Sequence, residues 1–367
     1  MQTALALAAS AGTLTGANPR VGCVLVNVQG QVIGQGHTQQ TGGPHAEIMA
    51  LRDAQSAGHS TVGCTAYVTL EPCSHHGRTG PCCDALIAAG VAKVVASIED
   101  PNPLVKGAGI QRLQVAGVTV EVGEGTTESR ELNIGFFSRM IRHKPWVRLK
   151  VAASIDGKTA LENGVSQWIT SPQARADGHA WRARANALLT GIGTVLDDSP
   201  RMDVRLVAAP RQPPLVVVDS RLQTPVDAPL FAAERPVYIY YAVPDSGRQQ
   251  SLESAGAQLI HLPGMQDDGT STGKVDLAAM LRDLAAKEIN ELHIEAGHKL
   301  NGSLLREGLV DELLVYLAPK LMGRGAAMAD FGPFTRLDQA PELEFLSTQM
   351  VGPDLRIVAR IAGQDHF

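Results

Sequence analysis

The apolar residues of the first 143 positions fall into two patterns that alternate along the chain. Short apolar runs predict buried strands near residues 21–26, 32–36, 65–70, 91–98 and 118–122. Helices are predicted at 45–57, 85–89, 109–116 and 126–142, and in the first of these Ile48, Met49 and Leu51 should face inward. Strands and helices that alternate with short connections predict a layered α/β sandwich.

The pattern restarts at Lys144-Pro145, where we place a domain boundary, so we expect one domain over 1–143 and a second over 144–367. Strands are predicted at 146–153, 187–190, 215–219, 237–241, 258–262, 292–295, 313–318 and 355–362. Ser171-Pro172 is a good N-cap and first-turn pair for a helix. Residues 265–274, rich in Gly, Ser, Thr and Asp, predict a surface loop.

The composition is that of a soluble globular protein without a basic surface. Apolar residues make up 44% and charged residues 19%, and the net charge is −5 with no long basic run, which argues against nucleic acid as a partner. No apolar run is long enough to span a bilayer, and residues 1–11 lack a basic leader. Five cysteines, three of them in one motif, favour metal binding in a reducing compartment over disulfides. We therefore expect a cytoplasmic protein with no membrane partner.

That cysteine-rich motif has the layout of zinc-dependent base deaminases. His45 and Glu47 form a His-x-Glu pair, and Cys73 follows Pro72, with Cys82 further on. One imidazole and two thiolates can hold zinc and leave a position open for a water whose pKa the metal lowers. A carboxylate that is not a ligand must then move protons, and Glu47 is the candidate. Pro44 predicts a helix start, with His45 and Glu47 in the first turn.

The spacing leaves the third metal ligand open. The usual second half is Pro-Cys-x-x-Cys, whereas eight residues separate Cys73 from Cys82, so Cys83, His75 and His76 are rival ligands. We favour Cys82, because Pro81 predicts a helix start and Cys83 would point about 100° away on that helix. A closed structural zinc site and unligated buried thiols are the alternatives, but a closed site would leave Glu47 without a role.

Two glycine-containing segments of the second half are candidates for a phosphate site. Gly191 and Gly193 lack the third glycine of the dinucleotide fingerprint, and a tight turn explains them better than a phosphate loop does. The segment from Gly297 to Ser303 follows a buried strand and opens a helix, where backbone N–H groups favour phosphate. These patterns alone predict no more than a nucleotide site.

Taken together, the motifs resemble the bifunctional deaminase/reductase family of riboflavin biosynthesis over nearly the whole chain. The resemblance rests on Asn18-Pro19-x-Val21-Gly22, Pro44-His45-Ala46-Glu47, Leu70-Glu71-Pro72-Cys73-Ser74-His75-His76-Gly77-Arg78-Thr79-x-Pro81-Cys82 and Asp100-Pro101-Asn102-Pro103. In the second half it rests on Ala153-Ser154-x-Asp156-Gly157-Lys158, Ser166-Gln167-Trp168-Ile169-Thr170-Ser171 and Glu295-Ala296-Gly297. The long spacing from Cys73 to Cys82 is this family's own pattern.

The resemblance implies an α/β fold for each half and two sequential reactions. The amino-terminal half would be a cytidine-deaminase-like three-layer sandwich that uses Zn²⁺ to remove the 2-amino group of a diaminopyrimidinone ribosylamine phosphate. The carboxy-terminal half would resemble dihydrofolate reductase in fold and use NADPH to reduce the ribosyl group to ribityl.

The resemblance also assigns roles to individual residues. His45, Cys73 and Cys82 would be zinc ligands and Glu47 the proton shuttle, while Asn18, His76 and Arg78 would face the substrate. NADPH would contact Ala152, Trp168, Thr170, Thr194, Asp198, Ser220, Gly297, His298, Lys299, Leu300, Asn301, Gly302 and Ser303. In the reductase half, the substrate would contact Ser166, Arg182, Met202, Arg205 and Glu295, and the two arginines suit its phosphate.

Two other functions are compatible with the metal motif. One is a zinc-dependent base or tRNA deaminase with a non-catalytic carboxy-terminal module, and the other is a zinc-stabilised binding protein without catalysis. The low basic charge favours a small-molecule substrate over tRNA. A homodimer is implied only by the family resemblance.

Overall fold

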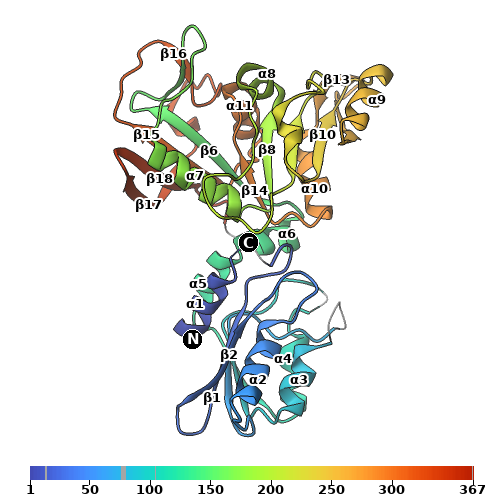
Figure 1. Cartoon of the computed structure of the whole chain (residues 1–367), viewed down its shortest axis with the longest axis vertical. Coiled ribbons are helices and arrows are strands. Elements are labelled where there is room, and N and C mark those ends of the chain that lie inside the picture. The colour runs from blue at the N-terminus through green and yellow to red at the C-terminus, as the bar shows by residue number, and fades with distance from the viewer. Residues whose placement is uncertain (13–14, 76–79, 104, 366) are drawn as a thin grey trace. The chain divides into compact units, whose positions relative to one another are not determined.

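The chain forms two compact units, Met1–His143 and Lys144–Phe367, which we call the amino-terminal and the carboxy-terminal unit. They are seen in a computed structural model that describes residues 1–12, 15–75, 80–103, 105–365 and 367 (Figure 1). The predicted site residues His76 and Arg78 lie outside the described residues. None of the described helices has the length and apolar character that crossing a bilayer requires.

The amino-terminal unit is built on a five-stranded sheet in the order β2-β1-β3-β4-β5. Strand β1 is antiparallel to β2 and β3, whereas β3, β4 and β5 are parallel. The strands are β1 (Gly22–Val26), β2 (Val32–His37), β3 (Thr65–Val68), β4 (Lys93–Ala96) and β5 (Thr119–Val122). The helices are α1 (Gln2–Ser10), α2 (Ala46–Ser56), α3 (Cys82–Ala88), α4 (Ala108–Val115), α5 (Thr126–Leu132) and α6 (Ile134–Arg142).

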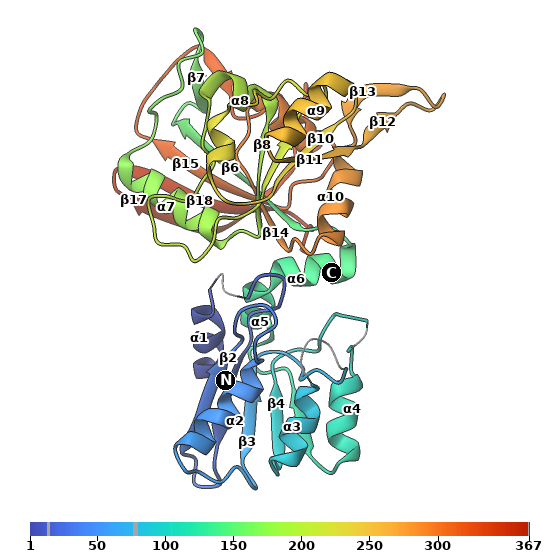
Figure 2. The same ribbon diagram turned by 45° about the vertical axis from the view of Figure 1, so that its right-hand side comes forward.

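Glycines let helices approach both faces of this sheet closely. A Cβ on Gly22 would lie 1.9 Å from the carbonyl oxygen of Ala4 in α1, and one on Gly34 would lie 2.3 Å from that of Ala50 in α2. Gly34 pairs with Leu25, which is three residues from Gly22, so the two glycines face opposite sides of the sheet. Helices α1 and α2 therefore cover opposite faces, and α3 lies beside α4 (Figure 2). The predicted three-layer sandwich is confirmed.

The inward face of α2 differs from the prediction. Its buried residues are Ala46, Glu47, Ala50 and Ala54, while Ile48, Met49 and Leu51 are only half-buried. The close approach to the glycines of β2 leaves room for alanine but not for larger side chains.

Residues 126–142 form two helices rather than the single one predicted, because Asn133 interrupts them. Its side chain accepts a hydrogen bond from the backbone N–H of Arg20 (2.7 Å) and donates one to the carbonyl of Arg20 (2.9 Å). These bonds hold the segment before β1, and the backbone of Asn133 leaves helical geometry at φ −120°.

The carboxy-terminal unit is built on a nine-stranded sheet in the order β11-β10-β9-β8-β14-β6-β15-β18-β17. Its strands are parallel from β11 to β15, and β18 and β17 are antiparallel additions at one edge. The strands of the sheet are β6 (Trp146–Ser154), β8 (Ala187–Gly191), β9 (Leu215–Val218), β10 (Val237–Tyr241), β11 (Ala257–His261), β14 (Glu291–Ile294), β15 (Glu312–Ala318), β17 (Leu343–Val351) and β18 (Asp354–Ile361). The helices are α7 (Pro172–Arg184), α8 (Ile192–Asp198), α9 (Ser246–Ser254), α10 (Leu277–Ala286) and α11 (His298–Arg306), with 3-10 turns η1 (Pro229–Ala232) and η2 (Leu337–Gln339).

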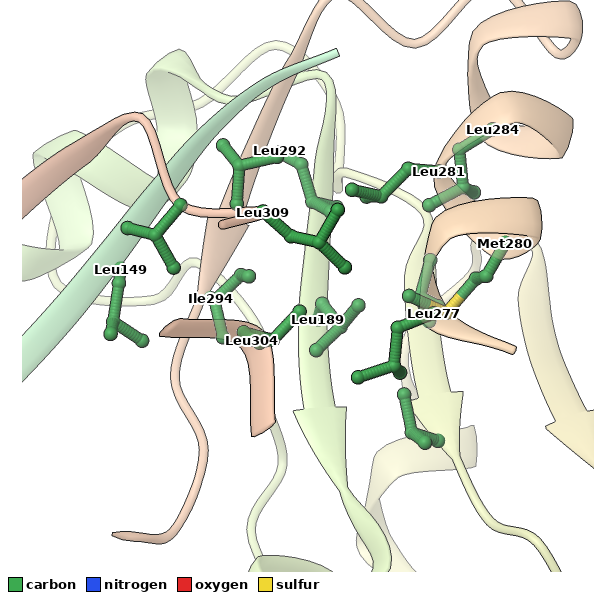
Figure 3. Close-up of a cluster of buried hydrophobic side chains, with 14 of the residues drawn as sticks. Leu149, Leu189, Leu277, Met280, Leu281, Leu284, Leu292, Ile294, Leu304 and Leu309 are labelled. Atoms are coloured by element: carbon green, nitrogen blue, oxygen red, sulfur yellow. The ribbon is translucent and has the colours of Figure 1, made fainter. Parts of the chain in front are cut away.

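Both faces of the central strands are buried, as the continuous apolar runs require. One face packs against α10 and α11, where Leu277, Leu281 and Leu304 contact a cluster that includes Leu189 and Ile294 (Figure 3). The opposite face holds a second cluster to which α9 contributes Leu252. The general architecture predicted for this half, a second α/β domain, is confirmed.

Two elements of the carboxy-terminal unit were missed or assigned wrongly. Residues 265–274, predicted as a loop, lie largely in a hairpin of β12 (Pro263–Met265) and β13 (Ser271–Val275). The edge strand β17 has no counterpart in the prediction, because its residues are exposed on both faces and show no burial pattern. A further small sheet joins β7 (Lys158–Leu161) to β16 (Gly325–Ala327).

Candidate metal centre and cofactor cleft

The structure brings His45, Cys73 and Cys82 together. One ligand atom from each lies within 4.8 Å of the others, and no other such metal-binding group occurs among the described residues. The Nδ1 atom of His45 is 3.3 Å from the sulfur of Cys82 and 3.6 Å from that of Cys73. One imidazole and two thiols with this spacing are a donor set that suits zinc and leaves a coordination position for water.

Local structure explains how the three donors meet. His45 is the N-cap of α2 with an extended backbone, so it precedes the helix, whereas the prediction put it in the first turn. Glu47 does lie in that first turn. Cys82 is the first residue of α3, as predicted, and its backbone N–H points at the sulfur of Cys73 at 3.4 Å.

The electrostatics of the cluster favour one thiolate even before a metal binds. A hydrogen bond from Cys82, assisted by His45, lowers the pKa of Cys73, and the same hydrogen bond raises the pKa of Cys82. Glu47 is only 3% exposed, and burial, together with the charge of Cys73, raises the pKa of Glu47 to about 7. The neighbouring His45 and Cys82 side chains oppose this rise in the pKa of Glu47.

The described rival ligands point elsewhere. The sulfur of Cys83 faces the carbonyl oxygens of Pro72 (3.1 Å) and Gly109 (3.5 Å), and burial raises the pKa of Cys83 to about 12. His75 is not part of the cluster. Asn18 is half-buried in the segment before β1, and within the described part of the chain its side chain forms no hydrogen bond with the three donors.

Sequence reasoning missed the residue that fixes the loop after β3. Glu71 is 3% exposed, and its carboxylate accepts hydrogen bonds from the backbone N–H groups of Asp100 (3.1 Å), Gly107 (2.9 Å), Gly109 (2.9 Å) and Ile110 (3.2 Å). Three of these groups belong to the start of α4, where a negative charge is favoured. An acidic residue directly after a buried strand, within two residues of Cys73, was the available signal.

The carboxy-terminal unit contains a cleft of about 2250 Å³ along the carboxyl ends of its parallel strands. Nearly all the predicted cofactor and substrate residues of this unit line it: Ala152, Ser166, Trp168, Thr170, Arg182, Thr194, Asp198, Met202, Arg205, Ser220, Glu295, Gly297, His298, Lys299, Leu300, Asn301 and Ser303. Gly302 does not, because it packs against the backbone of Asp330, where a Cβ would lie 1.9 Å from a carbonyl oxygen.

Glu295 is the centre of a charge network in this cleft. The Arg182 guanidinium donates to both of its carboxylate oxygens (2.5 and 3.0 Å), and Lys150 donates to one of them at 3.2 Å. Burial alone would raise the pKa of Glu295, but Arg182 and Lys150 overcome this and hold it well below its usual value. The sequence analysis did not single out Lys150, although it alternates with the core residues Leu149 and Val151 and so had to face the other side of β6.

A second group of charges surrounds Arg205. Arg205 pairs with Asp203 at 2.6 Å, and its backbone N–H donates to Nδ1 of His179 at 3.1 Å. Burial, reinforced by the positive charges of Arg182 and Arg205, lowers the pKa of His179 to about 4. Ser166, predicted to contact substrate, donates to Asp198 at 3.1 Å, so the structure joins a substrate candidate to a cofactor candidate.

The start of α11 fits a phosphate-bearing cofactor. Gly297 is its N-cap with an extended backbone and no side-chain cap, which leaves N–H groups of the first turn facing the cleft. Neither Gly193 nor Gly297 carries a side chain that would fill this space, and the nearest atom to a Cβ on Gly297 is the Thr194 hydroxyl at 3.7 Å. The free backbone N–H groups at the start of α11 and the open space beside Gly193 and Gly297 are both suitable for a dinucleotide.

Comparisons with known proteins cover both units. The family described as RibD C-terminal domain matches residues 145–357, and the cytidine and deoxycytidylate deaminase zinc-binding region matches residues 1–98. The chain is 44% identical to the riboflavin biosynthesis protein RibD of Escherichia coli K12, covering 97% of this chain and 96% of that protein. It is 37% identical to RibD of Aquifex aeolicus VF5, with the same coverage.

Solved structures agree with the sequence relatives. RibD of Acinetobacter baumannii aligns with a TM-score of 0.84 at 38% identity, covering 98% of this chain and 97% of that one. The diaminohydroxyphosphoribosylaminopyrimidine deaminase/5-amino-6-(5-phosphoribosylamino)uracil reductase of Thermotoga maritima aligns with a TM-score of 0.85 at 28% identity, covering 99% and 97%.

Proposed function

The chain belongs to the RibD family of riboflavin biosynthesis, and we propose that its amino-terminal unit is the deaminase and its carboxy-terminal unit the reductase of this bifunctional enzyme. The family uses Zn²⁺ and NADPH, and the donor set of one unit and the cleft of the other suit them. The proposed substrate is 2,5-diamino-6-ribosylamino-4(3H)-pyrimidinone 5′-phosphate.

In the amino-terminal unit, His45, Cys73 and Cys82 would hold zinc, which supplies an acidified water when bound. Glu47 lies beside these ligands without being one of them, and its carboxylate would carry a proton to the amine that leaves as ammonia. The backbone N–H of Cys82 stabilises the charge on Cys73.

In the carboxy-terminal unit, NADPH supplies a hydride when bound, and the chain provides binding and charge. The start of α11 would hold the pyrophosphate. Arg205 is 43% exposed along its side chain and uses one nitrogen on Asp203, so further donors are available for the substrate phosphate. Arg182 and Lys150 fix the orientation of Glu295, which lies at the same end of the cleft as Arg205.

The observation that carries this proposal is the convergence of His45, Cys73 and Cys82 beside a buried Glu47. The test mixes purified protein with the diaminopyrimidinone substrate and follows ammonia release and NADPH oxidation separately. We expect NADPH oxidation only after ammonia release begins, because the second reaction consumes the product of the first. Ammonia release without any NADPH oxidation would favour the alternative of a deaminase with a non-catalytic module, which the family match over both halves does not favour.

A substitution separates catalysis from structure at the metal centre. Glu47→Gln should abolish ammonia release while zinc content and the reduction of supplied deaminated product remain unchanged. Glu128→Gln, an exposed position in α5, is the matched control. Retained ammonia release in Glu47→Gln would contradict its assignment, and loss of zinc would point to a structural role.

We also propose that the enzyme is a cytoplasmic homodimer that uses the free edge of the nine-stranded sheet. Strand β17 is an unpaired edge on which Phe345 is 67% and Met350 60% exposed, which is costly in a monomer. Light scattering should give twice the chain mass, and Phe345→Lys should give the monomer.

All five cysteines are free, which suits a reducing compartment. The partner is a small molecule, with no part for nucleic acid or a membrane.

A further inference from the structure

The cleft of the carboxy-terminal unit is long and has a direction. It follows the carboxyl ends of β6, β14, β8 and β9, which are neighbours in that order. Three strand spacings correspond to about 14 Å, so an extended ligand is needed to reach from one end to the other. Glu295 marks the β14 and β6 end, Gly297 follows β14 into α11, and Ser220 follows β9 at the far end.

The positive charges at the two ends differ in a way that identifies their roles. At the β14 and β6 end, Arg182 and Lys150 pair with Glu295, and Arg205 pairs with Asp203. At the far end, Arg221 and Lys274 both line the cleft and are exposed, and neither side chain has a partner among the described residues. Lys299 at the start of α11 and Arg175, which donates to the carbonyl oxygen of Thr170 and lies over the Trp168 ring, also have no carboxylate partner among the described residues.

The two far-end cations come from different parts of the chain that the structure ties together. Arg221 directly follows Ser220 at the end of β9, and Lys274 directly precedes Val275 in β13. The backbone N–H of Val275 donates to the hydroxyl of Ser220 at 3.3 Å, which fastens the β12–β13 hairpin to the loop after β9. The hairpin that was predicted as a loop therefore supplies one wall of the cleft.

We propose that Arg221 and Lys274 bind the 2′-phosphate of NADPH and thereby select NADPH over NADH. The proposal rests on the proposed reductase function and deepens it. If the reacting nicotinamide lies near Glu295 and the pyrophosphate at the start of α11, the adenosine extends toward Ser220. Its 2′-phosphate then meets a guanidinium, which can bind two phosphate oxygens, and an ammonium that adds a point charge.

The test measures binding of NADPH, NADH and 2′,5′-ADP to the full chain by calorimetry, without substrate or turnover. Arg221→Ala and Lys274→Ala should each weaken NADPH and 2′,5′-ADP by about 10-fold or more, the range of one lost charged hydrogen bond. NADH binding should change by less than about 2-fold, because it lacks the 2′-phosphate. Arg282→Ala, an exposed cation on α10 outside the cleft, is the matched control and should change neither ligand.

The outcomes separate this inference from the assignment of the reductase. The double variant should bind NADPH and NADH alike, with an unchanged unfolding transition. If wild type prefers NADPH and the double variant keeps that preference, the inference is wrong and the reductase assignment stands. If wild type binds NADPH and NADH equally, no group reads the 2′-phosphate and the inference is again wrong. If wild type binds neither, the proposed reductase function fails as well.

Discussion

Replacing Glu71 by glutamine should loosen the amino-terminal unit far more than a change of one atom suggests. The carboxylate accepts four backbone N–H groups, two on each oxygen. A glutamine offers one oxygen, and its NH₂ group would face two N–H donors. The substitution therefore removes two charge-assisted hydrogen bonds. It leaves two buried backbone N–H groups facing the NH₂ group of the glutamine, which is itself a donor.

The expected magnitude follows from those two donors. Leaving a buried N–H without an acceptor costs about 1–3 kcal/mol, and Glu71 is almost fully buried. The loss for Glu71→Gln should thus be about 3–5 kcal/mol, a large part of the roughly 5–15 kcal/mol that stabilises a typical domain. The segment that relaxes is the start of α4, together with the loop that presents Cys73.

The distribution of tryptophan gives a clean assay. Trp146, Trp168 and Trp181 are the only tryptophans, and all lie in the carboxy-terminal unit. Urea unfolding followed by tryptophan fluorescence reports on that unit, and hydrogen exchange of amino-terminal peptides reports on the other. We expect Glu71→Gln to shift exchange in residues 100–110 while the fluorescence transition stays in place. Glu99→Gln, an exposed neighbour, is the control. A loss below about 1 kcal/mol in Glu71→Gln would refute the reasoning.

Three further predictions test other parts of the structure. Chelation of zinc should stop ammonia release but leave NADPH-dependent reduction of supplied deaminated product intact, since the donors all belong to the amino-terminal unit; parallel loss of both activities would contradict separate sites. The pKa of His179 is lowered to about 4 in the fold from 6.5, so stability present above pH 6.5 is lost as the pH falls toward 4. Urea unfolding at a series of pH values should show that the free energy of unfolding falls by about 1–2 kcal/mol between pH 7 and pH 5. His179→Gln can still accept the hydrogen bond from the backbone of Arg205, and it should remove this pH dependence. An unchanged pH dependence in that variant would contradict the assignment to His179. Gly22→Ala should destabilise the amino-terminal unit by about 1–3 kcal/mol in the exchange assay, because its Cβ would meet α1, whereas Gly80→Ala, with nothing within 4 Å, should not.

The parts of the fold that hydrophobic pattern alone decides were predicted well. Central strands such as β8 and β9 carry apolar residues on both faces, and their runs are visible in the sequence. The pattern failed where a long-range contact decides the outcome. Asn133 breaks a helix because it bonds Arg20, which lies 113 residues away, and no local signal shows that partner. Strand β17 was missed for a different reason: it buries almost no side chain within the monomer, so its sequence shows no pattern of buried positions.

Prediction of the sites shows the same division. The His-x-Glu and Pro-Cys motifs mark residues whose chemistry is encoded by residue type, and the structure brings His45, Cys73 and Cys82 together. Lys150, His179 and Glu71 were missed because a lysine in a strand, a histidine in a helix or a glutamate in a loop is ordinary by type. Only the tertiary neighbours of these residues give them a role, and those neighbours come from distant segments.

Glu47 and Glu71 show how the same residue type at the same burial acquires different chemistry. Each is 3% exposed, and each lies close in sequence to a candidate zinc ligand. Glu71 is met by four backbone amide donors, and these hydrogen bonds anchor the loop. Glu47 faces a thiol and an imidazole, which can themselves gain or lose protons, and burial opposes its charge. A carboxyl in the setting of Glu47 can exchange a proton with its surroundings, so the neighbouring groups, rather than the burial, separate a catalytic glutamate from a structural one.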